Sequence, residues 1–275
     1  MLVSILVPIR SYNPRLLSSL DSLVDQTYAP YEIVIVLDDA EPKAFSLVKL
    51  WKERLETQIG DTQSRQYSPV LRLYKNPHPK NLSRALNFGV SKCNGEWIAR
   101  ADADDVYSPF RIEKQMDLVR ELDYSPCLVA VSSNPLRKNL KDSNHLILRP
   151  LDFLFNNPII HSAVLIKREI LEANSYDEEF TFSQDYELWT RLVLKETLIL
   201  TKDNLVDLDQ STRRGKYVLS QENFFLKANI RFVLRLVTIS PKSIKYLSLL
   251  QALLIAYGRK LRLLKNGLRL KLGRW

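Results

Sequence analysis

The sequence has few glycines and few cysteines, with seven and two among its 275 residues. No Gly-x-Gly-x-x-Gly follows a strand-like run, and no Gly-x-x-x-x-Gly-Lys-Ser/Thr occurs, which argues against a Rossmann dinucleotide site or a P-loop. Cys93 and Cys127 show no Cys-x-x-Cys spacing, so nothing supports a disulfide framework or a zinc site. A reducing, cytoplasmic setting is therefore expected.

Long uncharged runs are also lacking. The run 246–258 and the slightly longer run 153–166 are both shorter than the roughly 20 residues that a bilayer-crossing helix needs. The apolar N-terminal run 1–8 has neither the basic region nor the small-residue cleavage site of a secretion signal. We therefore interpret this run as the first strand of the domain.

The first half of the chain alternates β-rich segments with amphipathic helical segments. Strands are expected at 3–8, 32–37, 70–74 and 96–101, and helices at 16–24, 45–55 and 82–90. Asn13 is expected to cap the first helix, with Pro14 in its first turn. This alternation predicts βαβ units and a mostly parallel sheet, in which ligands bind beyond the carboxyl ends of the strands. A further strand is expected at 163–167, followed by a helix that Ser183 caps.

Acidic residues cluster where the fourth expected strand ends. Asp102, Asp104 and Asp105 precede a helix that we expect to begin at Ser108-Pro109. Short carboxylates suit a hard cation such as Mg²⁺ or Mn²⁺, which would keep coordination positions open for phosphate oxygens. Acidic residues before a helix are also common as turn formers and N-caps, so other segments must decide between the two interpretations.

Several further segments follow one another in order. They are Ser4-Ile-Leu-Val-Pro8, Asp25-Gln-Thr-Tyr28, Glu32-Ile-Val-Ile-Val-Leu-Asp-Asp39, Asn81-Leu-Ser-Arg-Ala-Leu-Asn-Phe-Gly89, Gly95-Glu-Trp-Ile-Ala-Arg-Ala-Asp-Ala-Asp-Asp105, Asn157-Pro158 with His161, and Gln184-Asp-Tyr-Glu-Leu-Trp189. Together they resemble the inverting glycosyltransferases of family 2, which have the GT-A fold. The resemblance covers residues 1–215, with a nucleotide-sugar half at 1–110 and an acceptor half at 111–215.

The resemblance implies a site for a nucleotide-sugar donor at the strand ends. Asp38 or Asp39 would lie beside the base and ribose, and Asp102 and Asp104 match the family's Asp-x-Asp motif. Asp104 would be the direct ligand of Mn²⁺ or Mg²⁺, with Asp102 nearer the ribose or a metal-bound water, and Asp105 would orient the turn. The other donor-binding candidates are Pro8, Arg10, Asn81 and Arg84.

The resemblance also implies that Asp185 is the catalytic base. Family members usually have Glu-Asp where this chain has Gln184-Asp185, and the missing negative charge should lower the proton affinity of Asp185. His161 is expected to be a structural hydrogen-bonder and Trp189 a core residue. Both, together with Gln184, are candidates for contact with the acceptor or for support of the residues that contact it. Ala40, in place of a common glycine, predicts a turn without positive φ at that position.

The implied reaction is attack of an acceptor hydroxyl on the anomeric carbon of a sugar carried by a nucleotide, with UDP the favoured nucleotide. The acceptor would be a glycan or a lipid-linked glycan of a cell-surface polysaccharide. Two alternatives stay open: a sugar-phosphate nucleotidyltransferase, and a non-catalytic nucleotide-sugar-binding or scaffold protein. The first would normally carry a glycine-rich basic loop after the first strand, and residues 8–14 contain no glycine.

Basic charge is concentrated at the C-terminus. Residues 1–210 contain 25 Lys and Arg against 30 Asp and Glu, whereas residues 211–275 contain 15 against one. Apolar residues recur at helical spacing from Leu250 to Trp275, flanked by Lys and Arg. A helical basic tail is therefore expected over 216–275, with 242–275 bound to an anionic membrane surface at the inner face of the cytoplasmic membrane. The alternative is that this stripe packs on the catalytic domain or a second copy of the chain. Nucleic acid is not expected as a partner, because the tail lacks an aromatic stacking platform.

Overall fold

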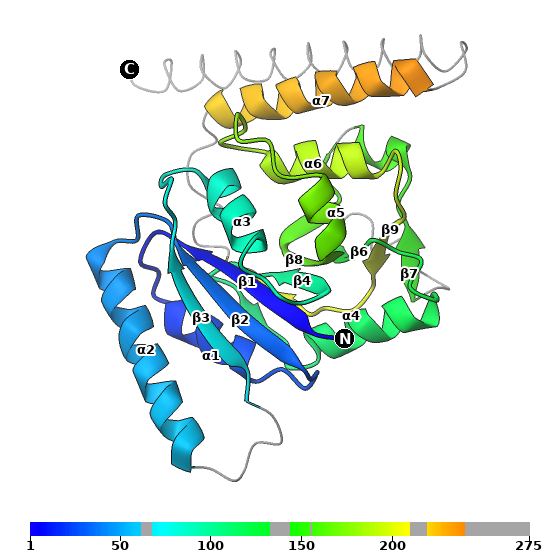
Figure 1. Ribbon diagram of the computed structural model, residues 1–275. Coiled ribbons are helices and arrows are strands. Elements are labelled where there is room, and N and C mark those ends of the chain that lie inside the picture. Colours follow the sequence, from blue (N-terminus) through cyan, green and yellow to red (C-terminus); the bar gives the residue numbers. More distant parts are fainter. Residues whose placement is uncertain (62–67, 133–143, 155, 210–218, 240–275) are drawn as a thin grey trace, which may run out of the picture.

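The computed structural model describes residues 1–61, 68–132, 144–154, 156–209 and 219–239, and its centre is an eight-stranded sheet (Figure 1). The strand order is β3 (Val70–Lys75), β2 (Tyr31–Leu37), β1 (Val3–Ile9), β4 (Trp97–Arg100), β8 (Ile159–Lys167), β6 (Leu128–Ser132), β9 (Leu198–Thr201) and β7 (His145–Ile147). Only β8 and β7 run antiparallel to their neighbours. The mixed α/β architecture with a mostly parallel sheet is thus confirmed. A separate two-stranded ribbon pairs β5 (Val106–Tyr107) with β10 (Val206–Asp207).

Helices cover both faces of the sheet. They are α1 (Leu16–Val24), α2 (Pro42–Asp61), α3 (Leu82–Val90), α4 (Arg111–Glu121), α5 (Arg168–Ala173), α6 (Gln184–Leu192) and α7 (Leu219–Ile239), with a 3-10 turn η2 (Pro150–Phe153). Residues of α1, α2 and α4 share one core cluster, and residues of α3, α5, α6 and α7 share the other. Neighbouring residues of β1 divide between them, because successive side chains of a strand point to opposite faces: Ile5 and Val7 belong to the first cluster and Leu6 to the second.

Burial on both faces explains why the central strands are continuous apolar runs. All seven residues of β2 and six of the seven in β1 are buried. The charged residue among them is Glu32 of β2. Its carboxylate accepts hydrogen bonds from Ser4 Oγ at 2.7 Å and from the backbone nitrogen of Asn94 at 2.6 Å. Arg72 adds an ion pair at 2.9 Å. A buried charge is tolerated here because it is paired and hydrogen-bonded.

The structure corrects three local predictions. Asn13 does not cap α1: its Oδ1 accepts a hydrogen bond from the backbone nitrogen of Arg15 at 2.7 Å in a local turn, and the helix begins at Leu16. The helix expected from residue 108 begins at Arg111. Ser183 precedes α6 but has a left-handed φ of 55° and makes no capping hydrogen bond with its side chain.

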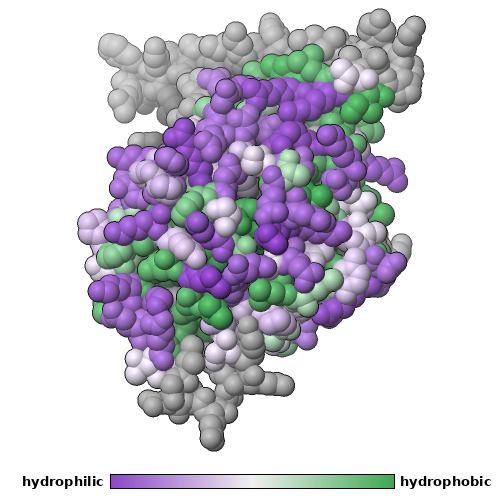
Figure 2. Space-filling view, in the orientation of Figure 1, coloured by the Kyte–Doolittle hydropathy of each residue, from purple (hydrophilic) through white to green (hydrophobic). Residues whose placement is uncertain are grey.

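Helix α7 packs across α6 (Figure 1). Ala228, Phe232 and Val233 are buried at this contact, and Arg235 Nη2 pairs with Glu187 Oε1 at 3.1 Å. The opposite edge of α7 is apolar and exposed, as the hydrophobic colour along it shows (Figure 2): Ile230, Leu234 and Ile239 are its large exposed residues. The basic stripe expected from Leu250 onward lies outside the described residues. Among those that are described, no helix combines the length and apolar character needed to cross a bilayer.

Candidate active site

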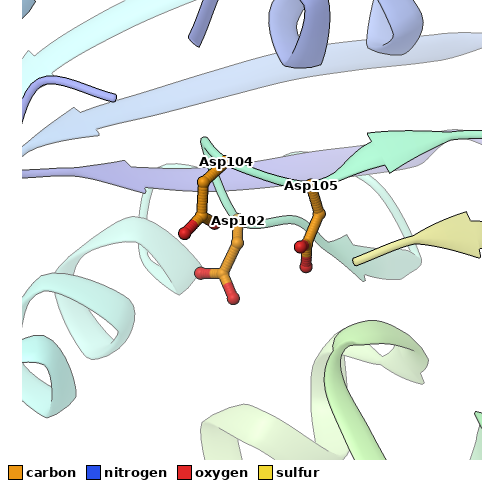
Figure 3. Close-up of side chains that lie close together, drawn as sticks. All are labelled: Asp102, Asp104 and Asp105. Carbon is orange, nitrogen blue, oxygen red and sulfur yellow. The ribbon is translucent and has the colours of Figure 1, made fainter. Parts of the chain in front are cut away.

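Three carboxylates project from the turn that follows β4. One oxygen each of Asp102, Asp104 and Asp105 lies within 4.8 Å of the others, and the three side chains extend to the same side of the turn (Figure 3). The turn is held by Tyr107, whose hydroxyl accepts from the backbone nitrogen of Asp102 at 2.6 Å and donates to its carbonyl at 3.1 Å. The acidic residues that the sequence placed at a strand end therefore do form one cluster.

Asp105 is the buried member of the cluster. Its Oδ2 accepts from Ser162 Oγ at 2.5 Å and its Oδ1 accepts from the backbone nitrogen of Asp209 at 2.8 Å. These bonds join the turn to β8 and to the segment after β10. Such contacts agree with the expectation that Asp105 orients the turn, while Asp102 and Asp104 are more open to solvent.

The carboxylates of the acidic cluster repel one another. Burial first, and then the neighbouring charges of Asp102 and Asp105, raise the pKa of Asp104 to about 6. A divalent cation would relieve this repulsion, and carboxylate oxygens are the donors that Mg²⁺ and Mn²⁺ prefer. The donor set therefore fits a hard divalent metal, with Asp104 and Asp102 as the residues that would hold it.

Arg100, which the sequence analysis did not single out, lies at the centre of the site. It is 3% exposed, and its Nη1 is 2.5 Å from Asp102 Oδ1. Burial alone would lower the pKa of Arg100, but Asp102 outweighs it and the pKa is raised, so the guanidinium stays charged. The signal in the sequence was an arginine at the end of an otherwise apolar strand, directly before the Asp-x-Asp pattern.

Asp185, the predicted base, lies in the first turn of α6 and is half-buried. Its Oδ2 accepts from Asn157 Nδ2 at 2.7 Å. Burial raises the pKa of Asp185, whereas the backbone of Tyr186, the charge of Arg100 and the hydrogen bond from Asn157 act in the opposite direction. Burial raises the pKa of Tyr176, the charge of Arg100 lowers it, and the charges of Asp185 and Asp102 raise it further. The structure thus brings the base and the acidic turn to the surroundings of one buried arginine.

The two acids after β2 have different environments. Asp38 is buried, and its Oδ1 accepts from Asn76 Nδ2 at 2.7 Å and from the backbone nitrogen of Lys80 at 2.9 Å, which orders the loop between β3 and α3. Asp39 is half-exposed and pairs with Lys80 Nζ at 3.4 Å. Ala40 has no positive φ, as expected, but Asp39 before it has a φ of 53°.

Asp39 also lines an open pocket of about 430 Å³ beyond the ends of β2 and β3. Leu37, Ala40, Pro42, Phe45, Lys75, Asn76 and Pro79 complete its lining among the described residues. Apolar walls with a few polar groups are typical of small-molecule sites. Of the two acids, Asp39 is therefore the one whose side chain is available to a ligand here.

The other donor-binding candidates lie around the same edge. Asn81 caps α3 by accepting from the backbone nitrogen of Arg84 at 3.2 Å, and its Nδ2 donates to the carbonyl of Glu178 at 2.9 Å. Arg84 Nε pairs with Glu178 Oε2 at 3.0 Å. Arg10 is exposed directly after β1, which contains the half-buried Pro8. Both Asn81 and Arg84 therefore also have structural partners.

The three candidates for the acceptor side are largely enclosed. His161 Nε2 lies 3.0 Å from Tyr176 Oη, and its ring contacts that of Trp189. Burial and then Arg100 lower the pKa of His161 well below its usual value, so the ring is neutral. Trp189 is fully buried in the core, and Gln184 is 7% exposed. These positions agree with a hydrogen-bonding histidine and a core tryptophan.

Residues 4–173 match Glycosyl transferase family 2, so the chain belongs to this family and is a glycosyltransferase. Among its relatives is the O-antigen biosynthesis glycosyltransferase WbnJ of Escherichia coli. The two are 29% identical over 209 residues, which is 74% of this chain and 76% of WbnJ.

The fold is similar to those of two solved structures, and the GT-A architecture is thereby confirmed. S. aureus TarS 1-349 in complex with UDP-GlcNAc superposes with a TM-score of 0.68 at 13% identity, over 94% of this chain and 73% of that one. The mannosyltransferase PcManGT from Pyrobaculum calidifontis, in complex with GDP-Man and Mn2+, gives a TM-score of 0.59 at 15% identity, over 95% and 80% of the two chains.

Proposed function

We propose that this chain is a metal-dependent, inverting glycosyltransferase that transfers a sugar from a nucleotide-diphosphate sugar to a hydroxyl of a glycan or lipid-linked glycan acceptor. The observation that carries the proposal is the cluster of Asp102, Asp104 and Asp105, with the buried Arg100 paired to Asp102 at 2.5 Å. Such a transfer needs a base for the acceptor hydroxyl and a cation for the leaving diphosphate. Asp185 would be the base, and the acidic turn has carboxylates that can bind the cation.

Asp185 would act as the general base. A sugar hydroxyl is a poor nucleophile, and removal of its proton in the transition state by a positioned carboxylate contributes roughly 10²- to 10⁴-fold. The hydrogen bond that Asn157 Nδ2 donates at 2.7 Å would hold the carboxylate in position toward the acceptor hydroxyl. The raised pKa of Asp185 makes it a better proton acceptor than an ordinary aspartate, and Arg100 keeps the ionised form accessible.

The acidic turn would hold the donor's diphosphate. Asp104 and Asp102 would bind Mn²⁺ or Mg²⁺, and the cation would supply the positive charge that stabilises the leaving diphosphate. The role of Arg100 would be to hold the Asp102 carboxylate in place, through their contact at 2.5 Å. Asp105 would keep the turn in place through Ser162.

We further propose that the donor is a UDP-sugar, transferred as a hexosyl or hexosaminyl group, and that Asp39 lies at its base and ribose. The support is the TarS complex with UDP-GlcNAc and the pocket that Asp39 lines. The name of WbnJ supports an acceptor in O-antigen-type polysaccharide synthesis. Other donor-binding residues would be Pro8, Arg10, Asn81 and Arg84.

The experiment is a thermal-shift panel of nucleotide sugars with and without Mn²⁺, followed by measurement of nucleotide release with the best ligand. We expect one nucleotide sugar to raise the melting temperature only with the metal, and to turn over when acceptor glycans are added. Binding without any turnover would favour the non-catalytic alternative. A panel in which no nucleotide sugar binds would reject the proposal.

We also propose that the chain acts at the inner face of the cytoplasmic membrane, through residues 242–275. The support is the excess of basic residues after position 210 and the exposed apolar edge of α7, with Ile230 and Leu234. Each basic residue near an anionic surface contributes about 1 kcal/mol. Sedimentation with anionic and with neutral liposomes tests this: the full chain should sediment with the anionic ones and a chain ending at residue 241 should not. Equal sedimentation of both chains would reject the membrane role. If the tail instead supports a homo-oligomer, the chain that ends at residue 241 should form a smaller assembly in solution than the full chain.

A further inference from the structure

Arg100 is a buried charge at the end of a central strand, and its backbone is held on both sides. It lies opposite Leu6 of β1 in the sheet, and its carbonyl accepts a hydrogen bond from Arg111 Nη2 at 2.7 Å. The residue is 3% exposed. A charged side chain in such a position needs a partner, because the desolvation of an unpaired charge is costly. The guanidinium therefore depends on a counter-charge nearby.

Asp102 supplies this counter-charge. Its Oδ1 lies 2.5 Å from Arg100 Nη1, whereas Arg100 Nε has no hydrogen-bond partner among the described residues. The side chain of Asp102 is 38% exposed and that of Arg100 is 4% exposed, so water can solvate the carboxylate but not the guanidinium. Arg100 therefore depends on the ion pair more than Asp102 does. A cation that approaches Asp102 has to compete with Arg100 for this carboxylate.

The neighbouring acids offer a cation little in place of Asp102. Both oxygens of Asp105 already accept hydrogen bonds, one from Ser162 Oγ and one from the backbone nitrogen of Asp209. Asp104 is the carboxylate of the cluster that neither these two contacts nor Arg100 engages (Figure 3). A cation without other ligands would thus find one unengaged carboxylate and a second one that it must share.

The charges of the turn act in the same direction. The guanidinium offsets the charge of one of the three carboxylates, and it repels a divalent cation at short range, where a partly buried site is weakly screened. Hard cations such as Mg²⁺ take about six oxygen ligands and commonly combine one or two carboxylates with substrate phosphates. A diphosphate would bring additional anionic oxygens and would also offset the charge of Arg100.

We propose that Arg100 makes cation binding depend on the nucleotide: it engages Asp102 in the unliganded protein, so that the acidic turn binds a divalent cation weakly by itself and tightly together with a nucleoside diphosphate. This inference rests on the proposed function. Arg100 acts in it as a positioning residue, which sets the availability of Asp102 and contacts no reacting atom.

The test is the affinity of the full chain for Mn²⁺, measured from the loss of the EPR signal of the aqueous ion, without nucleotide and with saturating UDP. We compare the wild type with Arg100→Met, which keeps a long unbranched side chain without the charge, and with Arg100→Lys, which keeps the charge. The melting temperature of each variant shows whether it is folded. If Arg100→Met does not fold, Arg100→Gln, whose amide can still donate to Asp102, takes its place with the same expected result.

The matched control is Arg72→Met. Arg72 also pairs with a carboxylate, that of Glu32, at 2.9 Å. It lies on β3, which β2 and β1 separate from β4 in the sheet. Loss of this arginine should therefore leave Mn²⁺ binding at the acidic turn unchanged.

We expect the wild type, Arg72→Met and Arg100→Lys to bind Mn²⁺ at least about tenfold more tightly with UDP than without it. In Arg100→Met, the affinity for Mn²⁺ without UDP should rise at least about tenfold, because the cation no longer meets a competitor for Asp102 or a nearby positive charge. UDP should then add less to the affinity for Mn²⁺ than it does in the wild type.

Unchanged or weaker binding of Mn²⁺ to folded Arg100→Met without UDP would overturn the inference, because an arginine that only orients Asp102 for the metal would give this result. If UDP still increased Mn²⁺ affinity in the wild type, the proposed function would be unaffected. Equal Mn²⁺ affinity of the wild type with and without UDP would instead reject both the inference and the metal-dependent function on which it rests.

Discussion

Replacement of Asp185 by asparagine tests the assignment of the base without a change of shape. The amide is nearly isosteric with the carboxylate, and its oxygen can still accept the hydrogen bond that Asn157 donates at 2.7 Å. The side chain is half-buried, in the first turn of α6, where the loss of one charge costs about 0.3–1 kcal/mol of helix-dipole stabilisation. Asp185→Asn should therefore fold normally.

Turnover of Asp185→Asn should fall by roughly 10²- to 10⁴-fold, which corresponds to about 2.7–5.5 kcal/mol of transition-state stabilisation. The assay is release of nucleoside diphosphate in the presence of acceptor, with the donor affinity measured separately by calorimetry. The fall should be in kcat, because Asp185 is on the acceptor side and the donor is bound through the acidic turn. The matched control is Glu169→Gln, an exposed carboxylate in the first turn of α5, which should keep wild-type activity. Normal turnover by Asp185→Asn would show that this carboxylate is not the base.

Three further predictions concern acidity and packing. Burial raises the pKa of Asp185, and the base acts only when it is ionised, so kcat/KM should fall at acid pH with a midpoint above the usual aspartate pKa. Asn157→Ala removes a hydrogen bond that lowers this pKa and should therefore move the midpoint upward. An unchanged pH profile in Asn157→Ala would contradict this prediction. Burial alone would raise the pKa of Glu32, but hydrogen bonds from Asn94 and Ser4 outweigh it and the pKa is lowered. The ionised Glu32 side chain therefore stabilises the fold at pH values above its unfolded-state pKa of about 4.3, and this stabilisation is lost as the pH falls through its lower folded-state pKa. Glu32→Gln should lower the free energy of unfolding in urea by about 2–4 kcal/mol at pH 7, and by less at pH 3. Gly95→Ala would place a Cβ 2.5 Å from the backbone nitrogen of Ser4, which should cost about 1–3 kcal/mol; a wild-type unfolding midpoint would refute the packing described here.

The N-terminal half of the fold was largely predictable from the sequence. Strands β1, β2 and β4 are buried, and burial on both faces requires the continuous apolar runs by which they were recognised. Strand β3, at the edge of the sheet, is only half-buried and was recognised by its β-rich composition. The second half of the fold was less predictable from the sequence. Strand β8 was predicted only from 163 but begins at Ile159, because its first residues include the half-buried polar His161, which interrupts the apolar pattern. Strand β7 has three residues, too few to show a period.

The acidic residues of the site were predictable from the sequence, but the interactions that connect them to other residues were not. The sequence pattern indicated that Asp102, Asp104 and Asp105 would lie together, and they do. It did not indicate that Arg100 would be buried and paired with Asp102, or that its charge would act on Asp185, because these depend on the tertiary structure. The hydrogen bond from Asn157 to Asp185 spans 28 residues and is likewise a product of tertiary structure.

The central claim is that the acidic turn binds a divalent cation and, through it, a nucleoside diphosphate. The most direct measurement is the affinity of UDP by calorimetry, with and without Mn²⁺, for the wild type and for Asp104→Ala. We expect Mn²⁺ to increase UDP affinity at least about tenfold in the wild type, equivalent to about 1.4 kcal/mol, and to have no effect in the variant. Equal UDP affinity with and without the metal in the wild type, or an undiminished metal effect in Asp104→Ala, would contradict it.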